Sequence, residues 1–296
     1  MKKICAFLFA ISFALCASAQ AVPSLLIGSD PVAFSTGGAA LARPADAFAV
    51  DNNAAAMALS AGTFDVAATY GKWAPKTADN MVVGLGTFYK VNDKLALGLS
   101  GRVLRDQPYD IASAGGQVTG SFTPMDVVAG LGLSYAVMDG LSLGVSARMV
   151  SSSIAADMKG TSFAADITAM YAQDAFSAAL GVCNLGSPMS YGGASYALPM
   201  LVKAGGAYAA AGLTASAEVD YLFSGALMAG LGLEYGIEDI VFLRGGFHYG
   251  DAAKAIPTYA SLGLGVKYAG AHIDLAFLTA SKTIGNSLML CLGYAF

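Results

Sequence analysis

The chain has 296 residues, of which 56% are hydrophobic and only 12% charged, and its formal net charge is −4. Soluble domains carry about a quarter charged residues, so this composition excludes a surface that mainly faces water. A helical membrane protein is excluded as well. Beyond the N-terminus no apolar run reaches the roughly 18 residues of a spanning helix, and the 36 glycines disfavour long helices.

Residues 1–19 have the pattern of a secretory signal peptide. Two lysines precede an apolar run at 4–16, and the small residues 17–19 form a cleavage site. A retained membrane anchor is the alternative, which the shortness of the run disfavours. Cleavage would leave 14 basic against 20 acidic residues, a net charge of −6. That balance gives no electrostatic footprint for nucleic acid.

Residues 20–61 are rich in alanine and glycine and show no period-two alternation. A barrel large enough to leave space inside is often filled by a segment of its own chain. We therefore expect this segment to form an N-terminal plug. The alternative is a loose periplasmic tail, because small residues also suit flexible linkers.

Residues 62–296 repeat units of about eight to twelve alternating residues. In one unit Leu97 and Leu99 fall on one face, while Ala96, Gly98 and Arg102 fall on the other. Apolar side chains outward and small or polar ones inward are typical of a transmembrane barrel. Short turns at 91–93, 138–140, 173–174, 210–212, 236–239 and 269–271 alternate with longer segments at 72–80, 106–124, 151–162, 184–199, 249–257 and 280–287. The sequence predicts an all-β fold, a transmembrane antiparallel β-barrel of about 14 strands.

The last ten residues, SLMLCLGYAF, form the expected closing strand. Its bulky face includes Leu290, Tyr294 and Phe296, and its other face is mostly small. We expect it to pair with the strand near 62–71, with both aromatic residues in the interfacial girdle. A strand that ends in Phe also resembles the signal by which bacterial barrels reach their insertion machinery, so Tyr294 and Phe296 are the expected assembly signal.

Charged side chains on the small-residue face are expected to line the lumen. Both signs are mixed there, which favours internal pairing over an ion-selective pore. The expected lumenal charges are Arg102, Arg148, Glu218, Asp220, Glu234, Arg244, Lys267 and Asp274.

The sequence predicts no enzyme, no cofactor and no metal site. Only His248 and His272 could serve as a base, and we expect the first in a loop or girdle and the second in a periplasmic turn. The outer-loop aspartates lack calcium-loop spacing. Cys183 and Cys291 either pair or face the lumen as inert small residues, the latter being favoured.

Three stretches resemble the start of the PorV/PorQ family of Bacteroidota outer-membrane proteins, which are related to FadL-type channels. The likeness lies in LLIGSD at 25–30, GGAALARPADAFAVDNNAAAMA at 37–58 and YGKWAPKTADN at 70–80. Asn53 stands where the family has proline, and one residue separates Trp73 from Pro75. The matching plug-motif residues are Asp30, Gly37, Gly38, Asp46, Asn52 and Asn53, and those of the first strand are Tyr70, Trp73 and Pro75.

The resemblance implies a FadL-like barrel in the cell outer membrane of a Gram-negative bacterium, reached by Sec-type export. It implies a scaffold or protein-binding role, with type IX secretion components or their exported proteins as partners beside membrane lipid and the insertion machinery. The alternative is a FadL-like channel for a hydrophobic small molecule. We expect inward positions to be mainly Gly, Ala, Ser and charges, which offer an acyl chain little apolar area. This expectation favours the scaffold over the channel.

Overall fold

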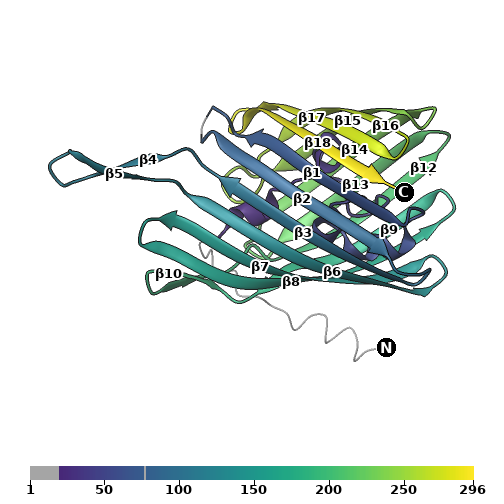
Figure 1. The fold of residues 1–296 in the computed structure, drawn as a ribbon, viewed down its shortest axis with the longest axis horizontal. Coiled ribbons are helices and arrows are strands. Elements are labelled where there is room, and N and C mark those ends of the chain that lie inside the picture. The colour runs from purple at the N-terminus through teal and green to yellow at the C-terminus, as the bar shows by residue number, and fades with distance from the viewer. Residues whose placement is uncertain (1–19, 77) are drawn as a thin grey trace.

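The computed structural model describes residues 20–76 and 78–296, and the expected signal peptide lies outside them. Its main element is a closed antiparallel barrel in which each strand pairs with the next barrel strand along the chain (Figure 1). This confirms the predicted fold class. The 14 barrel strands are β1 (Phe64–Trp73), β2 (Asn80–Lys90), β3 (Leu95–Arg105), β6 (Met125–Met138), β7 (Leu141–Ala155), β8 (Met158–Gln173), β9 (Phe176–Gly186), β12 (Leu201–Ala210), β13 (Leu213–Leu222), β14 (Leu227–Ile237), β15 (Val241–Gly250), β16 (Tyr259–Tyr268), β17 (Ala271–Ser281) and β18 (Gly285–Ala295).

The barrel closes between its first and last strands. In β1, residues 65–72 pair antiparallel with residues 288–295 of β18. Phe296 continues the contact, since its carbonyl accepts hydrogen bonds from Thr63 and Phe64 and its ring lies 5.2 Å from that of Phe64. Closure pairs the backbone groups of the edge strands, which would otherwise cost several kcal/mol each in hydrocarbon.

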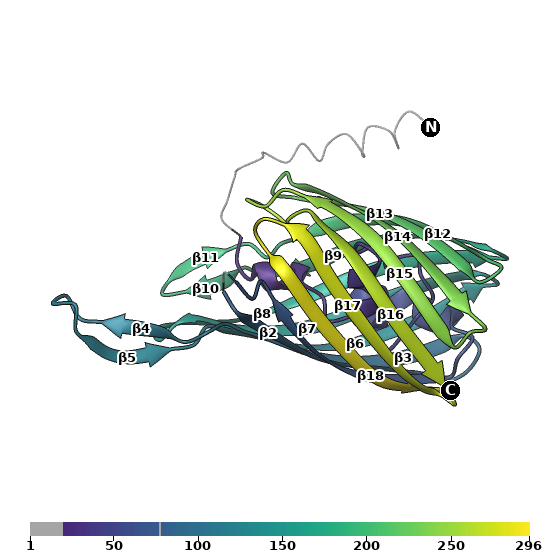
Figure 2. The same cartoon turned by 90° about the horizontal axis from the view of Figure 1, so that it is seen from above.

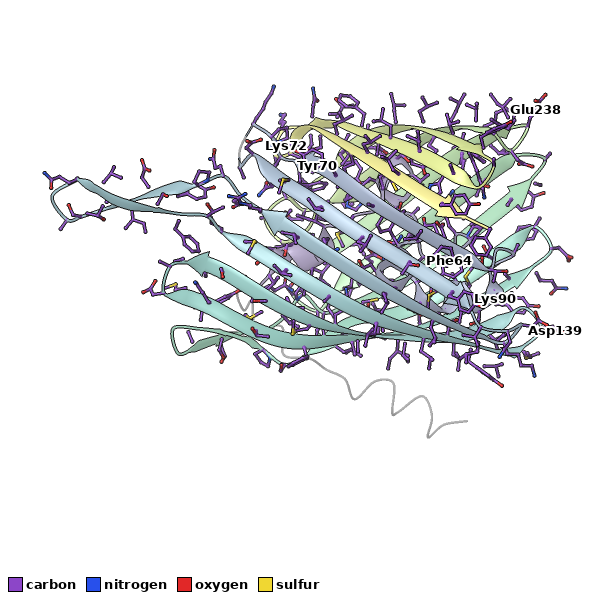
Figure 3. All side chains as sticks on the ribbon, viewed as in Figure 1. Phe64, Tyr70, Lys72, Lys90, Asp139 and Glu238 are labelled. Atoms are coloured by element: carbon purple, nitrogen blue, oxygen red, sulfur yellow. The ribbon has the colours of Figure 1, made fainter. Side chains whose placement is uncertain are left out.

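The two faces of the wall alternate as the sequence predicts. On β3, Leu99 is 54% exposed on the outside whereas Ala96 is fully buried inside. On β18, Leu290 and Tyr294 face outward and Cys291 faces inward. Figure 3 shows Lys90, Asp139 and Glu238 at the end that carries the C-terminus and Lys72 at the other end. The apolar outer band between these charges suits a bilayer.

The two ends of the barrel differ in their connections. The end near the C-terminus has the short turns and is called the short-turn end here; the opposite end is the long-loop end (Figure 2). Two predicted loops at the long-loop end contain hairpins. One is formed by β4 (Tyr109–Ala112) and β5 (Val118–Phe122), and the other by β10 (Met189–Tyr191) and β11 (Ala194–Tyr196).

The loop predicted at 151–162 is wrong. There β7 runs to Ala155 and β8 begins at Met158, so the serine-rich stretch continues the ladder. Ser152 and Ser162 face inward, where their hydroxyls meet no lipid. Serine therefore marked the inner face of long strands and not the end of a strand.

Residues 20–61, called the lumenal segment, lie inside the barrel (Figures 1 and 2). It holds η1 (Pro23–Leu26), α2 (Pro31–Ser35), α3 (Ala49–Asn52) and η2 (Ala54–Leu59). Helix α2 packs against β15 to β18, whereas α3 and η2 pack against strands from β2 to β8 on the other side. The segment starts at the long-loop end, where Ala21 donates to the Ala197 carbonyl, and ends beside Phe296 at the short-turn end. It therefore runs through the whole lumen.

None of the helices in the described residues is long and apolar enough to cross a membrane.

Candidate functional site in the lumen

The long-loop end of the lumen is apolar. Its core cluster joins Phe34 of α2 to Trp73 at the end of β1, with ring centroids 5.3 Å apart, and to inward side chains of the wall. Strand alternation explains the position of Trp73, because Tyr70 on the opposite parity points outward. Pro75 lies just beyond the strand, partly exposed. The wall side chains of this cluster include Val82, Leu222, Met228, Tyr259, Leu278 and Met289.

A cavity of about 660 Å³ opens beside this cluster and is called the mouth cavity. It is lined by Pro23, Leu26, Ile27, Trp73 and the loop residues 252–257. The expectation that inward positions are mainly small or charged is therefore wrong at this end. The repeated leucine–glycine units that suggested it lie in the half of the strands nearer the short-turn end. The bulky inward residues stand at strand ends and in loops, where alternation alone gives a weak signal.

Farther in, the wall holds the lumenal segment by hydrogen bonds to its backbone. Glu218 on β13 accepts from the amides of Ala40 and Leu41 at 2.9 and 2.7 Å, and its other oxygen lies 2.6 Å from Lys203 Nζ. Asn53 caps η2 by accepting from the Ala55 amide and donates to the Leu41 carbonyl. The carboxylate of Glu218 thus fixes a chain reversal inside the barrel.

The resemblance-derived motif residues take part in this packing. Asp30 caps α2 through the Val32 amide at 2.8 Å and accepts from Asn52 at 2.8 Å. Gly37 and Gly38 have positive φ values, +66° and +81°. A Cβ on Gly37 would lie 2.5 Å from the Phe247 carbonyl oxygen, so only glycine fits between segment and wall.

Small inward residues of the wall receive the segment in the same way. A Cβ on Gly144 would lie 2.1 Å from the Ala55 amide nitrogen, and one on Gly246 would lie 2.2 Å from that of Gly37. The inward glycines therefore accommodate the protein's own chain. These glycines contact the segment, so their lack of apolar area does not argue against an apolar ligand at the long-loop end, where the inward side chains are large.

A cavity of about 110 Å³, the middle cavity, lies between the segment and inward side chains of wall strands from β3 to β16. Arg148 pairs with Asp166 and donates to Asn184 at 2.9 Å. A β-bulge brings Asn184, at φ +59°, into this group. The backbone amide of Asn184 donates to Asp166 Oδ1 at 2.7 Å. Arg102 lines the same cavity, 5% exposed and with no ion pair among the described residues. Asp220 also lines it.

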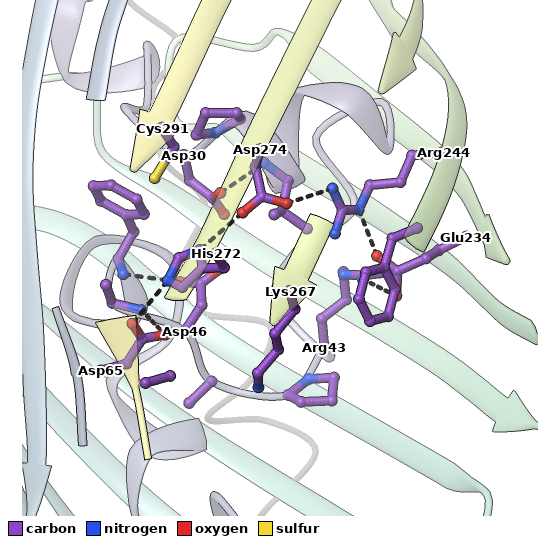
Figure 4. A pocket seen from close by; sticks show the side chains of 18 of the residues that line it. Asp30, Arg43, Asp46, Asp65, Glu234, Arg244, Lys267, His272, Asp274 and Cys291 are labelled. Atoms are coloured by element: carbon purple, nitrogen blue, oxygen red, sulfur yellow. Dashed lines mark hydrogen bonds and ion pairs between the residues drawn. The ribbon is translucent and has the colours of Figure 1, made fainter. Parts of the chain in front are cut away.

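At the short-turn end a chain of ionic contacts runs along the inner face of the wall (Figure 4). Arg43 of the segment lies 2.9 Å from Glu234, which also pairs with Arg244. Arg244 lies 2.7 Å from Asp274, and His272 lies 2.9 Å from Asp274. The last member of this series of contacts is Asp65, which lies 3.1 Å from His272. Asp65 also accepts a hydrogen bond from the backbone amide of Ala47 in the segment.

This chain borders a cavity of about 260 Å³, the short-turn cavity. Asp46 lies at its edge and accepts from the Phe48 amide. Lys267 points into it (Figure 4) and has no ion pair among the described residues. Partly buried charges linked in series fix the segment against strands far apart in sequence.

Both histidines lie elsewhere than expected. His248 is buried on β15, its Nδ1 lies 3.1 Å from the Gly37 carbonyl and its ring stacks on Tyr259. His272 is in β17, beyond the turn, and faces inward. Both histidines lie within strands, close to their ends. A shift of one residue along a strand moves a side chain from the outer to the inner face of the wall.

Four charged residues that form ion pairs in the lumen were not predicted from the sequence. Asp65, Asp166 and Lys203 stand at inward parity and could have been found by extending the alternation to every strand. Arg43 carries no periodic signal. Within the described residues, Cys183 and Cys291 are buried and form no disulfide. Among the loop acids, Asp106 accepts from Asn80, and burial raises the pKa of its carboxyl.

No family model and no curated protein matches the chain. Solved structures do resemble it. CymD, a monoaromatic hydrocarbon channel, aligns with a TM-score of 0.68 and 12% identity, covering 91% of this chain and 97% of CymD. The toluene transporter TodX of Pseudomonas putida gives 0.66 and 14%, covering 90% and 98%. A FadL homologue of Pseudomonas aeruginosa gives 0.56 and 13%, also covering 90% and 98%.

At these identities the likeness shows the fold, which is that of FadL-type barrels. Nothing in these comparisons supports a place in the PorV/PorQ family or an origin in Bacteroidota.

Proposed function

We propose that this protein is a non-enzymatic outer-membrane channel that takes up a small hydrophobic molecule in a Gram-negative bacterium. The observation that carries the proposal is the mouth cavity, a space of about 660 Å³ at the long-loop end. Its lining is mainly apolar, and its polar members are Gln20, Ser224 and Lys254. Ligand sites commonly measure about 300–1,000 Å³. Export by a cleaved signal at 1–19 belongs to the same proposal, as does the role of the lumenal segment as a plug.

The size of the cavity suits a ligand that must bind and leave again. An aromatic ring buries about 150 Å² or more, and at about 25 cal/mol per Å² this gives about 4 kcal/mol. That energy corresponds to a Kd of about 1 mM before association costs. The fold neighbours described as toluene transporters and hydrocarbon channels agree with this ligand class.

Uptake by intact cells tests this proposal. We expect Ile27→Glu, which places a charge in the mouth cavity, to reduce uptake of radiolabelled toluene at least tenfold. Ile111→Glu in the β4–β5 hairpin makes the same chemical change at an exposed loop site and should leave uptake unchanged. Equal uptake by the wild type, by Ile27→Glu and by cells lacking the gene would overturn the channel.

The second candidate is the protein-binding scaffold that the PorV/PorQ resemblance implies. The β4–β5 hairpin favours it, because the hairpin projects from the barrel (Figures 1 and 2) and exposes Tyr109, Ile111 and Val118. A two-stranded hairpin is only marginally stable alone, so a partner would stabilise it. Crosslinked outer membranes from cells with and without residues 109–122 would test this. Type IX secretion components recovered only with the intact hairpin would favour the scaffold.

A further inference from the structure

Three metal-ligating side chains lie together at the short-turn end. The ligand atoms of His272, Asp274 and Cys291 are all within 4.8 Å of one another. The ladder explains this, because His272 and Asp274 are two residues apart on the inner face of β17 and Cys291 is the cross-strand partner of Asp274. We propose that these residues bind a divalent cation of the zinc class.

The surrounding contacts prepare His272 to be a ligand. Its Nε2 lies 3.1 Å from Asp65 Oδ1, and its Nδ1 lies 2.9 Å from Asp274 Oδ2. When Nε2 carries the proton and donates to Asp65, the lone pair of Nδ1 faces Asp274 and the thiol. A carboxylate that accepts from the second ring nitrogen is the usual outer partner of a metal-bound histidine.

The other two ligands are also positioned by the protein. Asp274 Oδ1 accepts from Arg244 at 2.7 Å, which leaves Oδ2 toward His272. Cys291 is 2% exposed and forms no disulfide with any cysteine in the part of the chain that the structure describes. Figure 4 shows its sulfur on the same side of the cavity as Asp30 and Asp274. A thiolate, an imidazole and a carboxylate together are ligands that zinc takes in proteins.

The local charge balance favours a cation as well. Carboxylates outnumber the lysine and arginine side chains that line the short-turn cavity. The carboxylates are those of Asp30, Asp46, Asp65, Glu234 and Asp274, and the cations are Arg43, Arg244 and Lys267. Metal binding releases the thiol proton of Cys291 through the cavity as the sulfur–metal bond forms, while His272 binds through the lone pair of Nδ1. Three protein ligands leave a fourth position for water.

Cobalt titration of the protein purified from outer membranes tests the site. We expect one Co²⁺ per chain, a thiolate-to-cobalt charge-transfer band, and displacement by Zn²⁺. Cys291→Ser should lose the band and weaken binding at least tenfold. Cys183→Ser, the matched change at the other buried cysteine, should keep both. Asp65→Asn should keep the band and weaken binding about 10–100-fold.

Heat-modifiable migration on gels identifies the variants that fold. A wild-type chain without a saturable cobalt band would overturn the site whatever the variants do. A band that survives Cys291→Ser and disappears with Cys183→Ser would overturn it too.

Discussion

The two halves of the lumen are built from the same strands and differ in what their inward positions carry. At the long-loop end these positions hold large apolar side chains, such as Leu222, Met228 and Leu278, in a core cluster beside the mouth cavity. Toward the short-turn end they hold glycines, which receive the lumenal segment, and charges, which bind it. The difference separates the surface fit for an apolar ligand from the surface that retains the protein's own chain.

This division also limits the route that a ligand can take. Every neighbouring pair of barrel strands is hydrogen-bonded in the described wall, and the lumenal segment runs from one end to the other. In the proposed channel a molecule that leaves the mouth cavity must therefore pass along the segment, which has to shift. The contacts that retain the segment are thus the contacts that passage would have to loosen.

The largest effect is expected at Glu218. Changing Glu218→Ala leaves Lys203 without its ion-pair partner and the amides of Ala40 and Leu41 without their acceptor. Removing one member of a buried pair costs about 3–5 kcal/mol. Urea unfolding in detergent micelles measures this loss. Glu238→Ala, in an exposed turn, is the control and should change stability by about 0.5 kcal/mol or less. Equal losses would show that Glu218 does not hold the segment.

A smaller effect is expected where the segment touches the wall at Gly37. Gly37→Ala adds a Cβ 2.5 Å from the Phe247 carbonyl oxygen at a φ of +66°. The left-handed conformation costs about 1–2 kcal/mol, and overpacking adds about 1–3 kcal/mol. Gly116 has a similar φ, +78°, and open space around it. Gly116→Ala should therefore show only the cost of the left-handed conformation and none from overpacking. Matching losses in the two unfolding curves would contradict close contact between segment and wall.

The smallest effect is expected when the apolar core cluster around Phe34 and Trp73, called the mouth cluster, is compared with the outer face of the wall. Ile284→Val removes a methylene from a fully buried side chain of the mouth cluster and should cost about 1 kcal/mol. Ile273→Val makes the same change at a side chain that is 49% exposed on the outer face and should cost much less in micelles. The shift in unfolding midpoint compares them. A larger loss for Ile273→Val would mean that the mouth cluster is poorly packed.

The sequence predicts the barrel well because alternation is repeated in every strand and a closed wall is the only solution for exposed backbone in lipid. Its predictions fail where that repetition stops. Ser151 to Ser162 read as a loop, since serine suits both turns and an inner wall. The mouth cluster depends on single bulky residues at strand ends and on Phe34, whose partner Trp73 is distant in sequence. The ionic chain needs Arg43, which only the folded path of the segment brings to Glu234. The roles of Tyr294 and Phe296 in assembly stay a prediction.

Fluorescence of Trp73 tests the central claim most directly. Trp73 is the single tryptophan of the chain, is 6% exposed, and lines the mouth cavity. Bromobenzene, whose heavy atom quenches indole on contact, is titrated into the protein in lipid nanodiscs. We expect saturable quenching that toluene reverses and that Ile27→Glu weakens at least tenfold, while Ile111→Glu leaves it unchanged. Quenching that rises linearly without saturation, equally in all three proteins, would contradict an apolar ligand site at the mouth.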